Sequence, residues 1–486
     1  MRKKFATNLV FLLAANFIVK PFWIFGIDRV VQNRVGPEEY GLYFAVFNYS
    51  FLFSIVLDFG LNNFNNRAVS RNPSRLSGYF ANLFLLKFFL SITYTVLTFL
   101  FASASGYTDV QLKLLLSLIL NQILLSAILF FRSNLAALQF FKTDAIVSVL
   151  DRLLTIVFCG WLLWFSSNKS DFRIEWFIHA QTFALLITAF VAGLLVWSKN
   201  HVRLEIWKPK FSRNILWSSA PFALLALLMG IYSRMDAIMI ERLLPNGKEE
   251  AGIYAASFRL LDAANQFGYL FSVLLLPLFA ALIRQKSPVN QLVKFSAELI
   301  FAGSVALSMS CAFFGNEIMQ LLYPRANENW YRIFPLIMLT FIPMSSVYVF
   351  GTALTAKGSM KHLNIIAICG VLLNVVLNLM AIPKYGAYGA AWATLITQSI
   401  VAFLHLLVAM HLLHLRYSGQ SITRIAIFIL LCSAAALLTT KIPAPWIINF
   451  GLSVLVCVVF AIAMNLLPLK ETFRFFRGGN STIAPR

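Results

Sequence analysis

Ten charged side chains lie inside long apolar stretches of this chain, and their types limit the chemistry they could do. A charge in such a stretch is costly, so it points to ligand binding, ion or proton transfer, or an internal ion pair. Basic groups could bind an anion, whereas carboxylates could carry a proton or a cation. The ten residues are Lys20, Lys87, Arg152, Arg234, Arg259, Asp58, Asp151, Asp236, Asp262 and Glu298.

The stretches that hold these charges are predicted to be helices that cross a membrane. Fourteen of them run from Asn8–Ile27 to Trp446–Leu467, and each is close to the ~20 residues that a helix needs to span the hydrocarbon core. Every backbone polar group must be bonded internally there, which favours helices. We therefore predict an all-α membrane protein with 14 transmembrane helices.

The loops between these segments alternate between strongly basic and nearly neutral, and together they give a net charge of +21. This alternation is typical of the positive-inside rule, and it predicts that both termini are cytoplasmic. The basic loops are short and adjoin apolar segments, so anionic membrane lipid is the expected partner and nucleic acid is not.

The remaining motifs give no sign of catalysis. The cysteines lie singly within apolar segments, and the histidines form no metal-ligand pattern. We find no phosphate-binding loop of the G-x-x-x-x-G-K-[ST] type and no nucleophile with a matching base. We therefore expect no catalytic residues, no metal and no cofactor, so that the protein is not an enzyme.

An internal duplication organises the chain. Residues Glu38–Tyr43 return as Glu249–Tyr254, and upstream of them Asp28 and Arg34 return as Asp236 and Arg242. A second echo relates Leu135 and Lys142 to Leu354 and Lys361. Six segments separate the copies, which predicts a parallel repeat about an axis along the membrane normal.

The duplication predicts two pseudo-symmetric six-helix bundles around a central cleft, followed by two C-terminal helices. Rocking of one bundle against the other would expose the cleft to each side in turn, which is the geometry of a carrier. Prolines within the segments favour kinks. The predicted parts are an N-terminal lobe over 1–204, a C-terminal lobe over 205–415, two extra transmembrane helices over 416–470 and a basic cytoplasmic tail over 471–486. The prolines are Pro21, Pro221, Pro277, Pro335 and Pro343.

Three motifs stand out along the chain. The run Ile382–Thr394 contains a Pro-x-Tyr-Gly turn followed by small residues, after the asparagine-rich Leu372–Asn378. The other two are Asp58–Leu61 with Arg67, and Gly252–Leu260. The first motif resembles that of polysaccharide flippases in the multidrug, oligosaccharidyl-lipid and polysaccharide exporter superfamily, and the other two resemble the second and the eighth helix of that family.

The resemblance implies an O-antigen type flippase in the bacterial cytoplasmic (inner) membrane. Such a protein moves undecaprenyl-pyrophosphate-linked oligosaccharide from the cytoplasmic to the periplasmic leaflet for O-antigen, capsule or a related surface polysaccharide. Its further partners would be a glycan polymerase and a chain-length regulator. Transport could be coupled to a proton or sodium gradient, driven by membrane potential, or drawn by consumption of the product.

Substrate binding in a cationic cleft is assigned to Lys20, Arg259, Arg234 and Arg152. Lys20 lies beside Pro21 and could meet the pyrophosphate, although snorkelling or pairing with an acid is its alternative. Arg259 matches a basic position of the resembled family, with an ion pair to Asp262 as its alternative. Arg234 could act at ligand release or form an interfacial pair with Asp236.

Gating or ion coupling is assigned to Asp58, Asp236 and Asp262. Lys87 is expected to snorkel to the cytoplasmic face. Asp151 and Arg152 are adjacent on a helix, so each is expected to point in a different direction and to find partners on other helices.

Two other functions compete with a flippase. A multidrug antiporter of the same superfamily would need acidic and aromatic residues for a cation, whereas Lys20 and Arg259 are poor hosts for one. A membrane glycan polymerase, ligase or glycosyltransferase would usually need a larger loop outside the membrane than any found here. The sign of the charged residues within the membrane segments therefore distinguishes a flippase from a multidrug antiporter.

Overall fold

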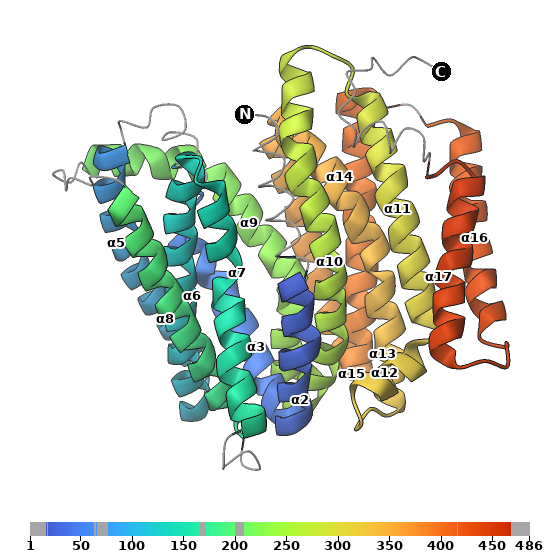
Figure 1. The fold of residues 1–486 in the computed structure, drawn as a ribbon, viewed down its shortest axis with the longest axis horizontal. Coiled ribbons are helices and arrows are strands. Elements are labelled where there is room, and N and C mark those ends of the chain that lie inside the picture. Colours follow the sequence, from blue (N-terminus) through green and yellow to red (C-terminus); the bar gives the residue numbers. More distant parts are fainter. Residues whose placement is uncertain are drawn as a thin grey trace. The chain divides into compact units, whose positions relative to one another are not determined.

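The computed structural model describes residues 16, 18–62, 65, 76–165, 172–199, 209–415 and 417–467. These residues are almost entirely helical, and no strand occurs among them. The chain divides into two compact units, Met1–Ala256 and Ser257–Arg486, each of which is described by itself. Figure 1 shows the helices along the chain. The predicted all-α fold is confirmed.

Twelve of the described helices are long and apolar enough to cross a membrane. One of them, α15 (Met360–Leu413), contains 54 residues and holds two predicted segments, with a non-helical Gly386 at φ 60° and ψ −143° between them. A Cβ at Gly389 would overlap the carbonyl oxygen of Ala381. Residues eight apart in a continuous helix lie ~12 Å apart, so the chain turns back here and crosses twice. The first predicted segment, Asn8–Ile27, lies partly outside the described residues.

The first unit is a bundle in which α6 and α8 pack together and against α7. Its apolar core includes Leu83, Ile128, Phe130 and Ala192, all at most 3 % exposed. The helices of the unit are η1 (Trp23–Asp28), α2 (Arg29–Val35), α3 (Pro37–Phe53), η2 (Ser54–Leu57), α5 (Leu76–Ala104), α6 (Asp109–Ala137), α7 (Phe141–Gly160), η4 (Trp161–Phe165), α8 (Ile174–Lys199), α9 (Pro209–Leu243) and the start of α10 (Gly247–Arg284).

The second unit contains the rest of α10, and in it α11 packs against α13, α14, α16 and α17 (Figure 1). Small buried residues such as Ala302, Ala306 and Ala461 line the contact with the two C-terminal helices, which allows close approach. Arg424 on α16 forms an ion pair of 2.7 Å with Glu298 on α11. The other helices are α11 (Asn290–Phe313), α12 (Gly315–Leu322), α13 (Glu328–Leu339), α14 (Phe341–Lys357), α16 (Gly419–Thr439) and α17 (Trp446–Ala463).

The second echo of the predicted duplication has the same backbone geometry in both units. Gln139 between α6 and α7 has φ 64°, and Gly358 between α14 and α15 has φ 80°. The amide of Phe140 donates to the carbonyl oxygen of Leu135 at 2.9 Å, just as that of Ser359 donates to Leu354 at 3.0 Å. This identical helix ending, at the predicted offset, supports the duplication.

The prolines act in different ways. Helices α9 and α10 continue through Pro221 and Pro277. After Pro21 the chain forms the π-helix η1, in which backbone bonding is rearranged. The boundary between α13 and α14 precedes Pro343, whose missing N–H leaves the carbonyl oxygen of Leu339 without its helical donor.

Candidate functional site

The structure brings Lys20 and Arg152 together at one place in the first unit. Lys20 lies in the helical residues 18–22 that lead into η1, and η1 packs against α7. The guanidinium carbon of Arg152 lies 4.3 Å from the centre of the Trp23 ring. Asn16 donates to the Ser148 hydroxyl at 3.0 Å, which joins the same two segments. Lys20 is close enough to Arg152 for their charges to repel.

More basic than acidic groups gather around this point. The Lys20 ammonium interacts electrostatically with Arg152, Asp151 and Arg132. Arg132 forms an ion pair with Asp144 at 2.7 Å, and Arg152 lies 3.5 Å from Asp151. All four of these side chains are at most about a third exposed. We call these five residues the cationic cluster: three cations face two carboxylates, so it carries a net positive charge that an anion could neutralise.

Arg132 is the member that sequence reasoning missed, because it was assigned to a loop. Helix α6 in fact continues to Ala137, and a tight turn at Gln139 starts α7 at Phe141. That turn places Arg132 opposite Asp144 across the two helices. The signal available in the sequence was the echo at Leu135 and Lys142, which marks this turn.

The expectation for Asp151 and Arg152 was only partly right. Arg152 does reach another helix, where it stacks on Trp23. The two side chains nevertheless also lie within 3.5 Å of each other, although their Cα–Cβ bonds diverge. Arginine is long enough to bend back to its neighbour while its planar face covers an indole ring.

Asp58 lies at a break that the motif Asp58–Leu61 creates. Helix α3 tightens into the 3-10 turn η2, after which Phe59 and Gly60 adopt φ of 43° and 77°. Asp58 accepts a hydrogen bond from the amide of Asn62 at 3.3 Å. A residue at positive φ is costly unless it is glycine, so this turn stays formed only because its surroundings hold it.

Lys87 provides that support, and the prediction that it snorkels is wrong. It is only 7 % exposed, and its ammonium donates to the Leu57 carbonyl oxygen at 3.0 Å, to Asp58 at 3.2 Å and to the Ser126 hydroxyl at 2.9 Å. The break in the helix leaves the Leu57 carbonyl without its helical donor. The lysine therefore replaces the missing helical donor at the Leu57 carbonyl oxygen and forms an ion pair with Asp58.

Arg234 and Asp236 belong to α9, and each contacts an aromatic residue of another helix. The Arg234 guanidinium carbon lies 5.7 Å from the centre of the Phe51 ring on α3. Asp236 is 1 % exposed and accepts a hydrogen bond from the Tyr254 hydroxyl at 2.9 Å. Its counterpart in the duplication, Asp28, is equally buried and accepts one from Tyr40 at 2.7 Å. Each copy thus holds its aspartate with a tyrosine from the following helix.

The two glycines related by the duplication meet at a junction within the first unit. A Cβ on Gly41 of α3 would overlap the Lys248 carbonyl oxygen, and a Cβ on Gly252 of α10 would overlap that of Pro37. The Gln32 amide donates to the carbonyl oxygen of Gly252 at 2.9 Å. Only residues without a side chain allow this approach.

A second set of contacts closes the same end of the unit. Gln111, which also caps α6 together with Thr108, donates to Glu241 at 2.7 Å. The Arg242 guanidinium carbon lies 3.9 Å from the centre of the Tyr107 ring. Burial raises the pKa of the Tyr107 phenol well above its ordinary value, so the ring faces the cation as a neutral group.

Arg259 and Asp262 lie on α10 in the second unit. The Arg259 guanidinium is 3.8 Å from the Asp262 carboxylate, at the predicted spacing of three residues, and the side chains are 8 % and 17 % exposed. At 3.8 Å the two groups are too far apart for a good hydrogen bond, so they form an ion pair. No cluster of histidine, cysteine or acidic residues that could hold a metal occurs in the described parts of the chain.

A family model described as polysaccharide biosynthesis protein matches residues 5–283. The chain is 26 % identical over 233 residues to a lipid III flippase of Escherichia coli, an alignment that covers 47 % of this chain and 56 % of that protein. The chain thus spans just over half the length of that relative. It is also 23 % identical to the probable low-salt glycan biosynthesis flippase Agl15 of Haloferax volcanii, over 82 % of both chains.

The fold itself is that of known transporters. The lipid II flippase MurJ, in an inward closed conformation, superimposes with a TM-score of 0.74 over 94 % of this chain and 99 % of the other, at 14 % identity. A multidrug resistance MATE transporter of the MOP superfamily has a TM-score of 0.60, over 84 % of this chain and 95 % of the other at 14 % identity. These likenesses describe the fold and leave the substrate to the residues of the site.

Proposed function

Since the chain belongs to the polysaccharide biosynthesis protein family, we propose that it is a flippase for a lipid-linked oligosaccharide. The named relatives that align with it in sequence are a lipid III flippase and a probable glycan biosynthesis flippase. A bulky polar head group cannot cross hydrocarbon unaided, whereas its lipid tail can stay in the membrane throughout. A multi-pass helical protein with buried charge is suited to that task.

The cationic cluster is the observation that carries the proposal. A pyrophosphate offers several charged oxygens, and two guanidinium groups and one ammonium can bind them with charge-assisted hydrogen bonds. The members of the cluster other than Lys20 lie within helices of membrane-spanning length, where water competes weakly. Asp144 and Asp151 orient the two arginines, and the charges of the five residues sum to one net positive charge.

The finer assignment follows the resemblance to O-antigen type flippases. The substrate would be undecaprenyl-pyrophosphate-linked oligosaccharide, moved by alternating access from the cytoplasmic to the periplasmic leaflet of a bacterial inner membrane. The alternating basic loops support cytoplasmic termini in this arrangement. A glycan polymerase and a chain-length regulator would act on the product, and no catalytic step is assigned to this chain.

Coupling to a proton or sodium gradient is the third part of the proposal. Asp58 and Asp262 each face a cation, at 3.2 Å from Lys87 and 3.8 Å from Arg259. Protonation of either acid would weaken an ion pair and shift the equilibrium between states. Asp236 could act through its hydrogen bond with Tyr254.

A multidrug antiporter shares the fold and is the competing function. A site for organic cations needs excess negative or aromatic surface, whereas the cationic cluster has an excess of positive charge. Resistance to cationic dyes, measured in cells that carry or lack the protein, distinguishes the two functions. The proposal predicts no change in resistance.

Export of surface glycan in a host that lacks its own flippase tests the proposal directly. Lys20→Ala is expected to lower the amount of surface glycan at least tenfold while protein abundance in the membrane stays normal, because one charge-assisted contact contributes about 1.5–3 kcal/mol. Lys113→Ala is the matched control, since Lys113 is an exposed lysine on α6 outside the cluster. Normal glycan in Lys20→Ala would contradict the assignment of the cluster.

A further inference from the structure

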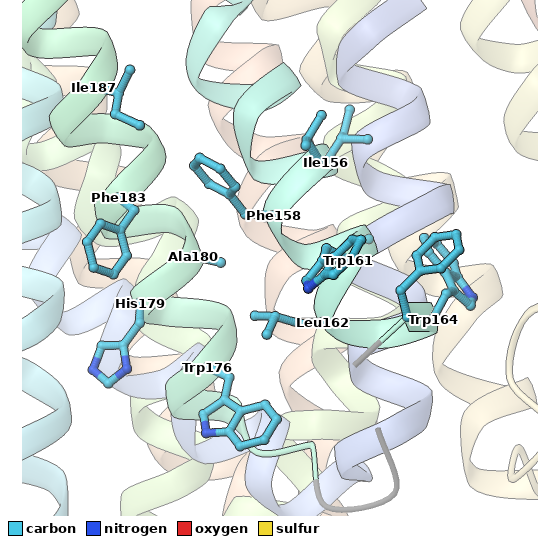
Figure 2. A pocket seen from close by; sticks show the side chains of 13 residues that line it. Ile156, Phe158, Trp161, Leu162, Trp164, Trp176, His179, Ala180, Phe183 and Ile187 are labelled. Carbon is cyan, nitrogen blue, oxygen red and sulfur yellow. The ribbon is translucent and has the colours of Figure 1, made fainter. Parts of the chain in front are cut away.

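A pocket of about 1050 Å³ lies between α7 and α8 in the first unit, apart from the cationic cluster. One wall is formed by the end of α7 and by η4, and the other by the first half of α8 (Figure 2). The walls are almost entirely apolar or aromatic. They include three tryptophans, Trp161, Trp164 and Trp176, and one ionisable residue, His179.

The pocket changes in character from one end to the other. Figure 2 shows Trp176 and His179 at the end where α8 begins, and Ile187 at the opposite end. Both helices are of membrane-spanning length, so the end of η4 and the start of α8 lie at an edge of the membrane. Indole and imidazole N–H groups therefore lie at the interfacial end, and aliphatic groups lie at the deep end.

A local change of helix type shapes one wall. At Trp161 the regular α7 gives way to the π-helix η4, which rotates the following side chains relative to an α-helix. Trp161 and Phe165 stack with ring centres 5.6 Å apart and are 63 % and 72 % exposed. Large exposed rings on a wide turn form a rim that a straight helix would not provide.

The depth of the pocket indicates the length of its occupant. From Trp176 to Ile187 the pocket follows α8 for about 16 Å, at ~1.5 Å per residue. Half of a hydrocarbon core that is ~30 Å thick is about 15 Å, the depth of one leaflet. A chain that spans one leaflet fits this length, whereas a long polyprenyl chain would extend far beyond it.

We propose that this pocket binds a membrane phospholipid, with one acyl chain lying between α7 and α8 and the phosphate at the end of Trp176 and His179. The imidazole and indole N–H groups are donors for phosphate oxygens, and the aromatic rim holds the upper part of the chain. The site is separate from the flipped substrate, so it survives if the proposed function fails.

Photo-crosslinking tests the site with a probe of known position. The purified full chain is placed in nanodiscs that contain phosphatidylglycerol with a diazirine near the head group or at the end of an acyl chain. The head-group probe is expected to label the segment around Trp176 and His179, and the chain-end probe the segments around Ile156 and Ile187. Peptide mass spectrometry locates the labels.

Two pairs of variants separate a specific site from general lipid contact. Leu162→Trp fills the pocket, and Leu186→Trp makes the same change on the exposed surface of α8 outside it. Phe183→Ala removes part of the wall, and Phe190→Ala is its control, because these phenylalanines are 63 % and 64 % exposed on the same helix. We expect labelling at Ile187 to fall about tenfold in each pocket variant and to stay unchanged in each control.

Three results would overturn the proposal. Equal labelling of the pocket and of the surface around Phe190 and Leu194 would show ordinary lipid contact only. Unchanged labelling in Phe183→Ala would contradict the site even if Leu162→Trp does not fold. Protection of the pocket by excess polyprenyl phosphate, but not by phosphatidylglycerol, would assign it to an isoprenoid chain.

Discussion

The two groups of buried charge in the first unit differ in their balance. Around the break in α3, one lysine faces one aspartate, and its remaining hydrogen bonds go to a backbone carbonyl oxygen and a serine. In the cationic cluster, three basic groups share two carboxylates, and the two arginines are more exposed than Lys87. The charges of the first group sum to zero, whereas those of the five residues in the cluster sum to one positive charge.

This difference separates structural charges from ligand-binding ones. An ion pair with no net charge and all its hydrogen bonds made is tolerated in the membrane, because each partner offsets the desolvation cost of the other. A surplus charge is tolerated only if a ligand or water compensates it for part of the time. Net charge and bonding of a group therefore say more about its role than the presence of a charged residue in a membrane segment.

The largest effect is expected where the balanced pair is broken. Lys87→Met removes the ammonium that donates to Asp58 and to the Leu57 carbonyl and leaves the Asp58 charge unpaired, at a cost of about 3 kcal/mol. Membrane abundance, thermal stability in detergent and glycan export should all fall. The double variant Lys87→Met/Asp58→Asn should recover part of the stability, since no unpaired charge remains. Equal stability of Lys87→Met and wild type would contradict the structural role.

Reversal of charge in the cluster should instead remove transport alone. Arg152→Glu turns the net charge of the cluster from positive to negative, so we expect export to fall about 100-fold or more with normal abundance. Arg213→Glu makes the same change at an exposed arginine and serves as the control. A parallel loss of abundance in Arg152→Glu would place this residue with the structural charges.

The pair in the second unit is the intermediate case. Arg259→Ala is expected to lower export about tenfold, because a guanidinium 3.8 Å from Asp262 can still bind an anion. Export by Arg259→Ala/Asp262→Ala decides between ligand binding and internal pairing. Recovery in the double variant would show that Arg259 only neutralises Asp262.

The smallest effect is expected at Arg132, whose charge Asp144 largely compensates at 2.7 Å. Arg132→Gln should lower export only several-fold, because its main role is to hold the turn between α6 and α7 and to contribute to the field at Lys20. Export in Asp144→Asn should rise or stay level, since the cluster becomes more positive. A loss in Asp144→Asn as deep as that in Arg152→Glu would contradict the electrostatic account.

Much of the fold could be predicted from the sequence because the signals are physical and local. Apolar length identified the membrane helices, and the echo at Leu135 and Lys142 marked a turn that recurs at Gly358 with the same hydrogen bonds. Gly386 was expected to form a tight connection, and it does. The two-lobe division at 204 and 205, the cleft and the cytoplasmic tail over 471–486, which lies outside the described residues, stay predictions.

The site was harder to predict, because pairing depends on where a helix breaks. Lys87 was expected to snorkel because it lies about two helical turns from the predicted cytoplasmic face, yet the turn at Phe59 brings Asp58 and the Leu57 carbonyl oxygen to it. Arg132 was assigned to a loop because the predicted segment ended at Phe131, whereas α6 continues to Ala137. Lys20 and Arg152 meet through the packing of η1 on α7, which no sequence spacing encodes.

The affinity of the purified protein for a polyprenyl-pyrophosphate oligosaccharide, compared between wild type and Lys20→Ala/Arg152→Ala, tests the central claim most directly. If the cationic cluster binds the pyrophosphate, the dissociation constant of the double variant should rise at least about 100-fold, while Lys113→Ala leaves it unchanged. An unchanged dissociation constant in the folded double variant would contradict the account.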